Sequence, residues 1–155
     1  MNVFCNRKEG VDVYNMILRK KGLSLEVVQL DDTTMEEKEP DRVSIDALTY
    51  TGSFSDVAHE GSGEASLIPL SDIEYALRLT DLDVLNGPDL RVLLSPNENV
   101  RGSGDLGEYI ELGKLKGNKG NQNYEIPEGT DLTKFQSMVI YCKPFHVVFA
   151  TAELQ

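Results

Sequence analysis

Cysteine is scarce in this sequence. Only Cys5 and Cys142 occur among 155 residues, and they form no CxxC pair. Two cysteines are too few for a disulfide framework, so a small scaffold stapled by several bridges is excluded. A single Cys5–Cys142 bridge stays open as an alternative, although no spacing pattern enforces it. A chain of this length buries enough surface to fold without staples.

Positive charge is also in short supply. The chain has 15 Lys and Arg against 26 Asp and Glu, for a net charge of −11. Binding to phosphate backbones needs clustered Lys and Arg, so the balance argues against a nucleic-acid partner. It argues equally against an anionic membrane surface. We interpret the excess of acids as a solvated surface rather than a dedicated cation site.

Long hydrophobic runs and a leader pattern are missing as well. The most apolar stretch, near the C-terminus, is interrupted by Lys143-Pro144 and falls short of the roughly 20 unbroken apolar residues of a membrane span. Met1 to Cys5 shows no charged start followed by an apolar core. We therefore expect no membrane span. The chain is either intracellular or begins after a removed leader.

The N-terminal part predicts a short helix and a strand. Val11, Tyr14, Ile17 and Leu18 recur at helical spacing within residues 11–20, and Gly22 follows. Residues 23–30 alternate in the manner of a strand.

An acidic segment then separates two parts of the chain. Residues 31–41 read DDTTMEEKEPD and have no apolar periodicity, which predicts an exposed linker. The predicted domains are accordingly residues 1–44 and 45–155. A calcium loop is the alternative for this segment, but it lacks the spacing of acids that such loops require.

Short strands punctuated by turns follow. Residues 74–82 alternate cleanly, the NGPDL turn begins at Asn86, and residues 90–94 and 108–112 predict two further strands. No alternation of strands with helices is present, so we predict an all-β, antiparallel sandwich or barrel.

The C-terminal stretch combines a glycine- and asparagine-rich loop with two strands. Residues 116–123 predict a tight turn with positive φ at Gly120 and at Asn118 or Asn123. Residues 136–154 predict two consecutive buried strand segments with a kink at Pro144. Alternation places Phe145, Val147 and Phe149 on one core-facing stripe.

The same stretch resembles the DM-thirteen domain, an extracellular module often found beside DOMON and b-type cytochrome domains. The resemblance rests on LGKLKGNKGNQNYEIP, on the VIYCKPF and FATAEL strands, on Gly87-Pro88-Asp89-Leu90 and on His59. The loop motif within it comprises Gly117, Asn118, Gly120, Asn121, Asn123 and Tyr124. The resemblance implies a cell-surface or extracellular location, an electron-transfer role with a redox partner domain, and Cys142 as the redox-active residue.

The residues themselves favour a different role for Cys142. Alternation puts Met138, Ile140 and Cys142 on one face of a strand and Val139 and Tyr141 on the other, so both faces are apolar. A thiol in apolar surroundings reacts slowly, and cysteine is often a core residue. Lys143 points to the opposite face. A core thiol is therefore the competing interpretation.

Other chemistry is weakly indicated. His59, Cys142, His146 and Met138 are the ligand types of a blue-copper site, but no Met follows His146 and Pro144 interrupts the pair. The lone His59 is more typical of a hydrogen-bonded or surface histidine. The KGNKGN run offers backbone N–H groups to an anion, with a tight loop as the plainer interpretation.

No catalytic constellation is recognisable in the sequence. RGSGDLG is not part of the strand–helix–strand unit of a dinucleotide-binding site. The serine- and glycine-rich sequence near Gly61 does not match the nucleophile elbow of a hydrolase. We therefore expect a non-enzymatic module without a cofactor and with a protein partner. Two functions compete, a redox module using Cys142 and a structural or adhesive interaction domain.

Overall fold

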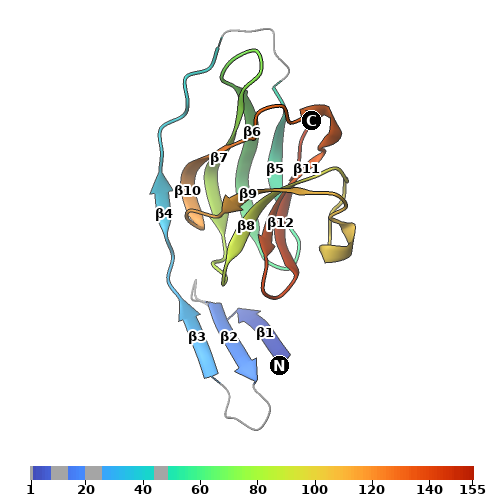
Figure 1. Ribbon diagram of the computed structural model, residues 1–155. Coiled ribbons are helices and arrows are strands. Elements are labelled where there is room, and N and C mark those ends of the chain that lie inside the picture. Colours follow the sequence, from blue (N-terminus) through green and yellow to red (C-terminus); the bar gives the residue numbers. More distant parts are fainter. Residues whose placement is uncertain (1, 8–13, 20–25, 44–48) are drawn as a thin grey trace.

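The computed structural model describes residues 2–7, 14–19, 26–43 and 49–155, and for residues before Asp31 only the backbone is described. Two β-sheets and two short 3₁₀ turns make up this part of the chain, in which there is no α-helix. The predicted all-β class is thus confirmed (Figure 1).

The described part of the chain contains twelve strands. They are β1 Asn2–Arg7, β2 Tyr14–Arg19, β3 Glu26–Leu30, β4 Thr34–Glu36, β5 Thr51–Asp56, β6 Gly61–Pro69, β7 Tyr75–Val84, β8 Leu90–Ser95, β9 Ile110–Lys114, β10 Lys119–Glu125, β11 Ser137–Cys142 and β12 Val147–Glu153. The 3₁₀ turns are Ser103–Asp105 and Leu132–Lys134.

The first three strands form a sheet of their own, in the order β1-β2-β3. The helix predicted over residues 11–20 is wrong for Tyr14–Arg19, which is the central strand of this sheet. Pairing with two neighbours overrides a helical spacing that was short and without an N-cap. Residues 11–13 and 20 lie outside the described part. The predicted strand over residues 23–30 is confirmed for Glu26–Leu30.

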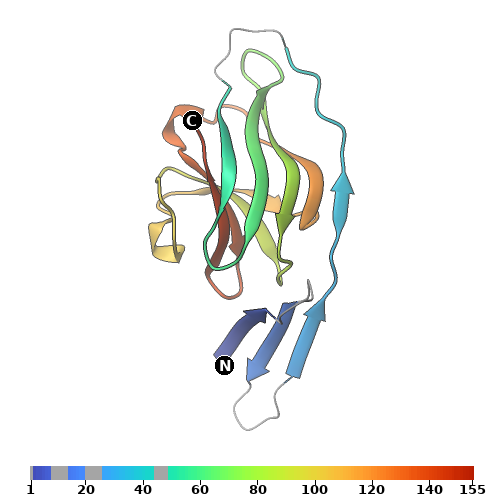
Figure 2. The same cartoon turned by 180° about the vertical axis from the view of Figure 1, so that it is seen from behind.

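The other nine strands form one curled sheet, in the order β4-β10-β7-β6-β5-β12-β11-β8-β9. β5 lies at its middle and changes partner along its length: Thr51–Ser53 pair with β6, and Phe54–Asp56 pair with β12. The two halves of the sheet curl towards each other around β5 (Figures 1 and 2). All pairings are antiparallel except that of β4 with β10, which is parallel.

One large apolar core fills the inside of the curl. Leu67, Leu77 and Leu79 enter it from one half of the sheet, and Ile140 and Phe149 enter it from the other. A second, smaller cluster covers the outer face of β8, β11 and β12 and consists of Leu93, Val100, Leu106, Val139, Tyr141 and Val148. The strand β11 therefore lies between two apolar layers, and all six of its residues are buried.

Several predicted strands are confirmed with adjusted ends. Residues 74–82 fall in β7 and residues 90–94 in β8, whereas the strand predicted at 108–112 is β9, displaced to Ile110–Lys114. The expected kink at Pro144 is wrong. β11 and β12 are antiparallel neighbours, and residues 143–146 form the hairpin turn between them, with His146 at φ 53°. Proline and a positive φ favour a turn over a continued strand.

The acidic segment is not only a linker. Thr34–Glu36 form β4, which pairs with Lys119–Asn121 at the edge of the curled sheet (Figure 2). The loop predicted over residues 116–123 is likewise corrected, because Lys119–Asn123 belong to β10. Gly120 has the expected positive φ, at 87°, but Asn118 and Asn123 do not. Whether a domain boundary falls at residue 44 remains a prediction.

Candidate functional sites around Cys142 and along the β10 edge

Cys142 lies at the end of β11 and is completely buried, with 0 % of its surface exposed. Its side chain points into the large core with Met138 and Ile140, as alternation predicts, and Leu90 is its partner residue on β8. The thiol lies 3.3 Å from the carbonyl oxygen of Pro88, which accepts its hydrogen. The thiol thus contacts the backbone of a turn.

That turn, residues 86–89, covers the thiol from the rim of the sheet. Gly87 packs so closely that a Cβ there would lie 2.7 Å from Cζ of Phe149. Asp89 has a φ of 49°, a conformation that asparagine and aspartate tolerate better than other side chains. The side chain of Asn86 accepts a hydrogen bond from the Gly87 N–H at 2.9 Å. The NGPDL motif, from which only a turn is predicted, therefore forms the turn that covers Cys142, which we call the lid.

An ion-pair network fixes one side of the turn. The guanidinium of Arg91 donates two hydrogen bonds to the carboxylate of Asp89, at 2.7 and 2.9 Å, and a third to Glu111 at 3.1 Å. This hydrogen bonding by Arg91 holds the pKa of Asp89 below its usual value. The amine of Lys143 reaches Glu111 at 3.4 Å. The Lys143 side chain thus belongs to the surface network, while the neighbouring thiol points inward.

A surface hollow of about 520 Å³ adjoins the turn. Its lining includes Gly87 and Asp89 from the turn and Lys114 and Lys116 from the stretch between β9 and β10. The amine of Lys116 is paired with the Glu37 carboxylate at 2.8 Å, which leaves Lys114 as the lysine of the lining for which no ion pair is described.

The two histidines lie apart from each other. The ring of His59 packs edge-on against Phe149, with centroids 4.5 Å apart, on the core side of β12. Nδ1 of His146 lies 2.9 Å from the hydroxyl of Tyr141, whose side chain belongs to the outer cluster. Tyr141 and Cys142 point to opposite faces of β11, so His146 is held away from the thiol.

This arrangement does not gather the four residues of the copper alternative. No group of three or more His, Cys, Asp or Glu side chains within residues 31–43 and 49–155 is placed to hold a metal ion. The side chain of Cys5 is not described, and a Cys5–Cys142 bridge therefore remains untested. The supporting roles of His59 and His146 also stay predictions.

The loop motif forms a second polar site, which is built around two buried amides. Gln122 is 0 % exposed and bonds both backbone groups of Gly117, at 3.2 Å through Oε1 and at 2.8 Å through Nε2. The hydroxyl of Tyr124 donates to Gln122 at 2.6 Å and accepts from the N–H of Lys116 at 2.8 Å. Burial raises the pKa of Tyr124, which keeps this hydroxyl a donor.

Asn118, just before β10, links the end of β7 to the residues just before β4. Its amide donates to the Val84 carbonyl at 2.9 Å and to the Asp32 carboxylate at 2.8 Å, and its oxygen accepts from the N–H of Thr33 at 2.7 Å. The N–H of Lys119 donates to the Thr33 carbonyl at 3.2 Å. These bonds occupy the polar groups that the anion-cradle alternative requires, so the KGNKGN run binds the chain's own acidic segment.

The two glycines of the motif give β4 room to approach. A Cβ at Gly117 would lie 2.6 Å from the Thr33 carbonyl oxygen, and one at Gly120 would collide with the Met35 carbonyl oxygen. Such contacts are closer than real side chains tolerate. The spacing of Gly117 and Gly120 is therefore explained by a strand lying across both.

Glu37 is the most heavily bonded acid of the segment. Its carboxylate accepts from Nζ of Lys116 at 2.8 and 3.1 Å and from the N–H of Asn123 at 2.8 Å. The hydrogen bond from Lys116 is the main reason that the pKa of Glu37 is lowered. Arg78, which is 7 % exposed, donates to the Glu37 carbonyl at 2.8 Å and to the Asn123 side chain at 2.9 Å.

Sequence reasoning singled out the loop motif of this second site but missed the residues that complete it. Gln122, Arg78, Lys116 and Glu37 were not among the predicted residues, and Glu37 contacts partners up to 86 residues distant in the chain. No local pattern reports such a contact. The one available signal in the sequence is Arg78, a charged residue within the regular strand pattern of residues 74–82. A buried charge needs partners, so Arg78 indicates polar groups nearby.

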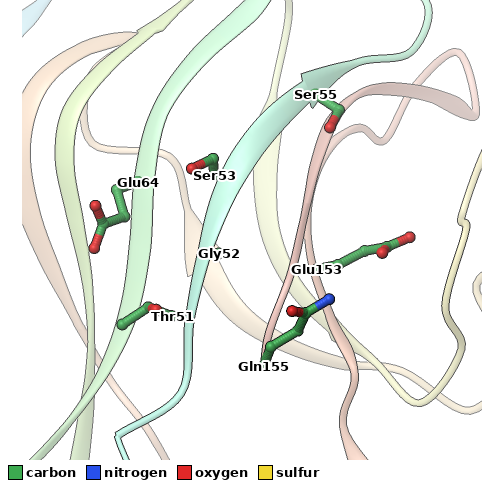
Figure 3. A pocket seen from close by; sticks show the side chains of 7 residues that line it. All are labelled: Thr51, Gly52, Ser53, Ser55, Glu64, Glu153 and Gln155. Carbon is green, nitrogen blue, oxygen red and sulfur yellow. The ribbon is translucent and has the colours of Figure 1, made fainter.

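A second hollow, which is polar and measures about 390 Å³, lies where β5 changes partner (Figure 3). Glu64 and Glu153 flank β5 there, and Thr51, Gly52, Ser53, Ser55 and Gln155 complete the lining. Both carboxylates already accept hydrogen bonds, Glu64 from Ser66 at 3.3 Å and Glu153 from the N–H of Asn99 at 3.1 Å. The hollow thus shows no chemistry that points to a ligand.

The chain matches one known protein family. No curated protein and no solved structure matches it. In the described ranges, no helix has the length and apolar character needed to cross a membrane. The model of one family, described as electron transfer DM13, matches residues 53–154, from within β5 to the end of β12. The match includes Cys142, the turn that covers it and the β10 motif, and the chain therefore belongs to the electron-transfer DM13 family.

Proposed function

We propose that the protein is a non-enzymatic redox module that exchanges electrons with a protein partner through Cys142, outside the cell. Family membership supports the redox class, and the extracellular location follows the resemblance. The observation that carries the assignment to this residue is the 3.3 Å contact between its sulfur and Pro88, in a turn at the surface. Cys142 is the only cysteine of the matched region.

A thiol–disulfide exchange fits a single cysteine. The Cys142 thiolate attacks one sulfur of a disulfide in the partner, a new S–S bond forms, and the partner's S–S bond breaks. The departing sulfur leaves as a thiolate and takes a proton from water. A thiolate of a second, reducing protein then attacks the partner's sulfur in this mixed disulfide, and Cys142 leaves as a thiolate. A further thiol of the reducing protein breaks the resulting bond, so two electrons pass from its dithiol to the partner's disulfide.

Access is the step that the fold controls. With 0 % exposure, Cys142 cannot meet a second sulfur until residues 86–89 move. The turn is held by the Asp89–Arg91 ion pair at the surface, by a hydrogen bond from the Lys143 N–H to the Asp89 carbonyl, and by one from the Asn86 amide to the Asp31 carbonyl. Lys114 lines the adjoining hollow, which favours a partner with an acidic residue beside its disulfide.

The test uses the chain carrying Cys5→Ser and a small aromatic disulfide whose released thiol is coloured. We expect slow release from this parent, faster release from Asp89→Asn, and none when Cys142→Ser is added. Asn keeps the tolerance for positive φ but loses the charged fork to Arg91. Asp72→Asn, an exposed site in the β6–β7 turn, is the matched control and should behave as the parent.

Absence of exchange in the Asp89→Asn chain would overturn the redox role. An interaction domain is the second candidate, and the complete burial of Cys142 between Ile140 and Leu90 favours it. In that function the thiol serves the core alone, and Cys142→Ala would leave partner binding unchanged.

A further inference from the structure

The β10 edge recognises an extended acidic strand in detail. Along the segment, Asp32 meets Lys119 at 3.2 Å and Asn118 at 2.8 Å, while Glu36 meets Asn121 at 3.3 Å. Glu37 meets Lys116 at 2.8 Å. Counted from Asp32, polar side chains of the β10 region thus bind acids at the first, fifth and sixth positions of the segment. The backbone of β10 pairs with that of β4.

This acidic strand comes from outside the family domain. The family match begins at residue 53, whereas β4 ends at Glu36. The motif that holds β4 lies inside the match, with Gly117 and Gly120 shaped to admit a strand. The domain therefore carries a groove for a strand that it does not itself contain.

We propose that this edge is a binding groove for an acidic extended segment of another polypeptide, and that β4 occupies it within the same chain as a built-in competitor. Adding a strand to an exposed sheet edge is a common way to bind a peptide, in which main-chain bonds give affinity and side-chain contacts give specificity. The bound segment has acids at the positions of Asp32, Glu36 and Glu37.

The resident strand is suited to leave. β4 has three residues and only β10 as a neighbour in the sheet, and Thr34 and Glu36 are exposed. The segment 31–39 holds five acids, which repel one another in a chain of net charge −11. Short edge strands with few buried contacts open more easily than core strands. While β4 is bound, an outside peptide can bind only the chains whose groove is empty. Its apparent affinity is therefore the intrinsic affinity multiplied by the fraction of such chains.

The experiment uses the full chain and a synthetic peptide with the sequence of residues 31–38, DDTTMEEK. Met35→Pro opens the groove, since proline cannot donate to a ladder and Met35 lies opposite Gly120. Glu37→Lys is the second opening variant and does not depend on proline. Glu128→Lys, an exposed acid after β10, is the matched control.

We expect the opened chains to bind the peptide at least about tenfold more tightly than the wild type or the Glu128→Lys chain, as measured by calorimetry. Adding Lys116→Glu to Met35→Pro should abolish binding, and a peptide with Lys in place of its second Glu should restore it. If the Met35→Pro chain does not unfold cooperatively, it is not properly folded, and the proposal is then tested with the Glu37→Lys chain.

Two results would overturn the proposal. The first is no binding to an opened chain that still unfolds cooperatively, which would make the groove a structural seat for β4 alone. The second is equal binding to the wild type and the opened chains, which would place the peptide elsewhere on the surface. Neither result bears on thiol exchange at Cys142, so this proposal and the redox function fail independently.

Discussion

The β11–β12 hairpin and the β4–β10 pair belong to one curled sheet but are held by opposite kinds of contact. The hairpin is apolar on both faces, and its residues from Met138 to Cys142 are buried. The β4–β10 pair has an exposed outer strand, fixed by amides, two glycines and ion pairs. Burial of apolar surface is non-directional, whereas the polar pair depends on the position of single atoms.

The two kinds of contact serve different purposes. A strand between two apolar layers accepts various apolar side chains, but displacing it costs much free energy. An edge strand held by directed hydrogen bonds accepts only side chains that match those bonds, and displacing it costs less free energy. The thiol of Cys142 lies in the first environment, and the family motif lies in the second.

The largest expected effect lies in the hairpin. Phe149 is 1 % exposed and touches both Gly87 and His59, so Phe149→Ala should lower the free energy of unfolding by about 3–5 kcal/mol. Urea unfolding measures it. Phe145→Ala, at the partly buried hairpin turn, is the comparison and should cost clearly less. A loss of less than about 1 kcal/mol for Phe149→Ala would mean that the ring is not a core residue.

A smaller effect is expected from Gly120→Ala in the polar pair. The residue has a φ of 87°, and a Cβ would strike the Met35 carbonyl, so we expect a loss of about 1–3 kcal/mol. Hydrogen exchange should show the change concentrated in Thr34–Glu36. Gly104→Ala has open space and should stay within about 0.5 kcal/mol of the parent. Unchanged exchange in β4 would refute the glycine argument.

The smallest effect concerns pH. The pKa of Glu37 is lowered in the folded protein from 4.5, mainly by Lys116, so its contribution to stability is present above pH 4.5 and is lost as the pH falls through the lowered pKa. Glu37→Gln removes this contribution. The wild type should be the more stable of the two at pH 7, and the two should converge in acid. A difference that persists after the Glu37 carboxylate has been protonated would assign the contribution to packing.

The sequence predicts which faces of β11 are buried but misses the turn between β11 and β12, and it predicts the polar pair badly, for a physical reason. Alternation along Met138 to Cys142 is a local signal, and it places each side chain on the correct face. Burial of the thiol follows from the same signal. The lid over it, with its link between Cys142 and Pro88, joins residues 54 positions apart and is not visible in either stretch.

The acidic segment shows the opposite case. DDTTMEEKEPD lacks apolar periodicity, and by composition alone it predicts a solvated linker. Its strand forms because β10 supplies the backbone partners and Lys116, Asn118 and Arg78 supply the polar ones. The Gly and Asn residues of the motif likewise predict a turn, since their use in close strand approach depends on a neighbour that is remote in the chain.

The most direct measurement is the rate at which Cys142 is alkylated, in the Cys5→Ser chain at neutral pH, as a function of urea below the unfolding transition. We predict slow labelling that is nearly independent of urea, faster in Asp89→Asn than in Asp72→Asn, because opening of one turn exposes little surface. Labelling that only follows global unfolding would contradict the gated redox thiol, and prompt labelling at the rate of the unfolded chain would contradict the lid.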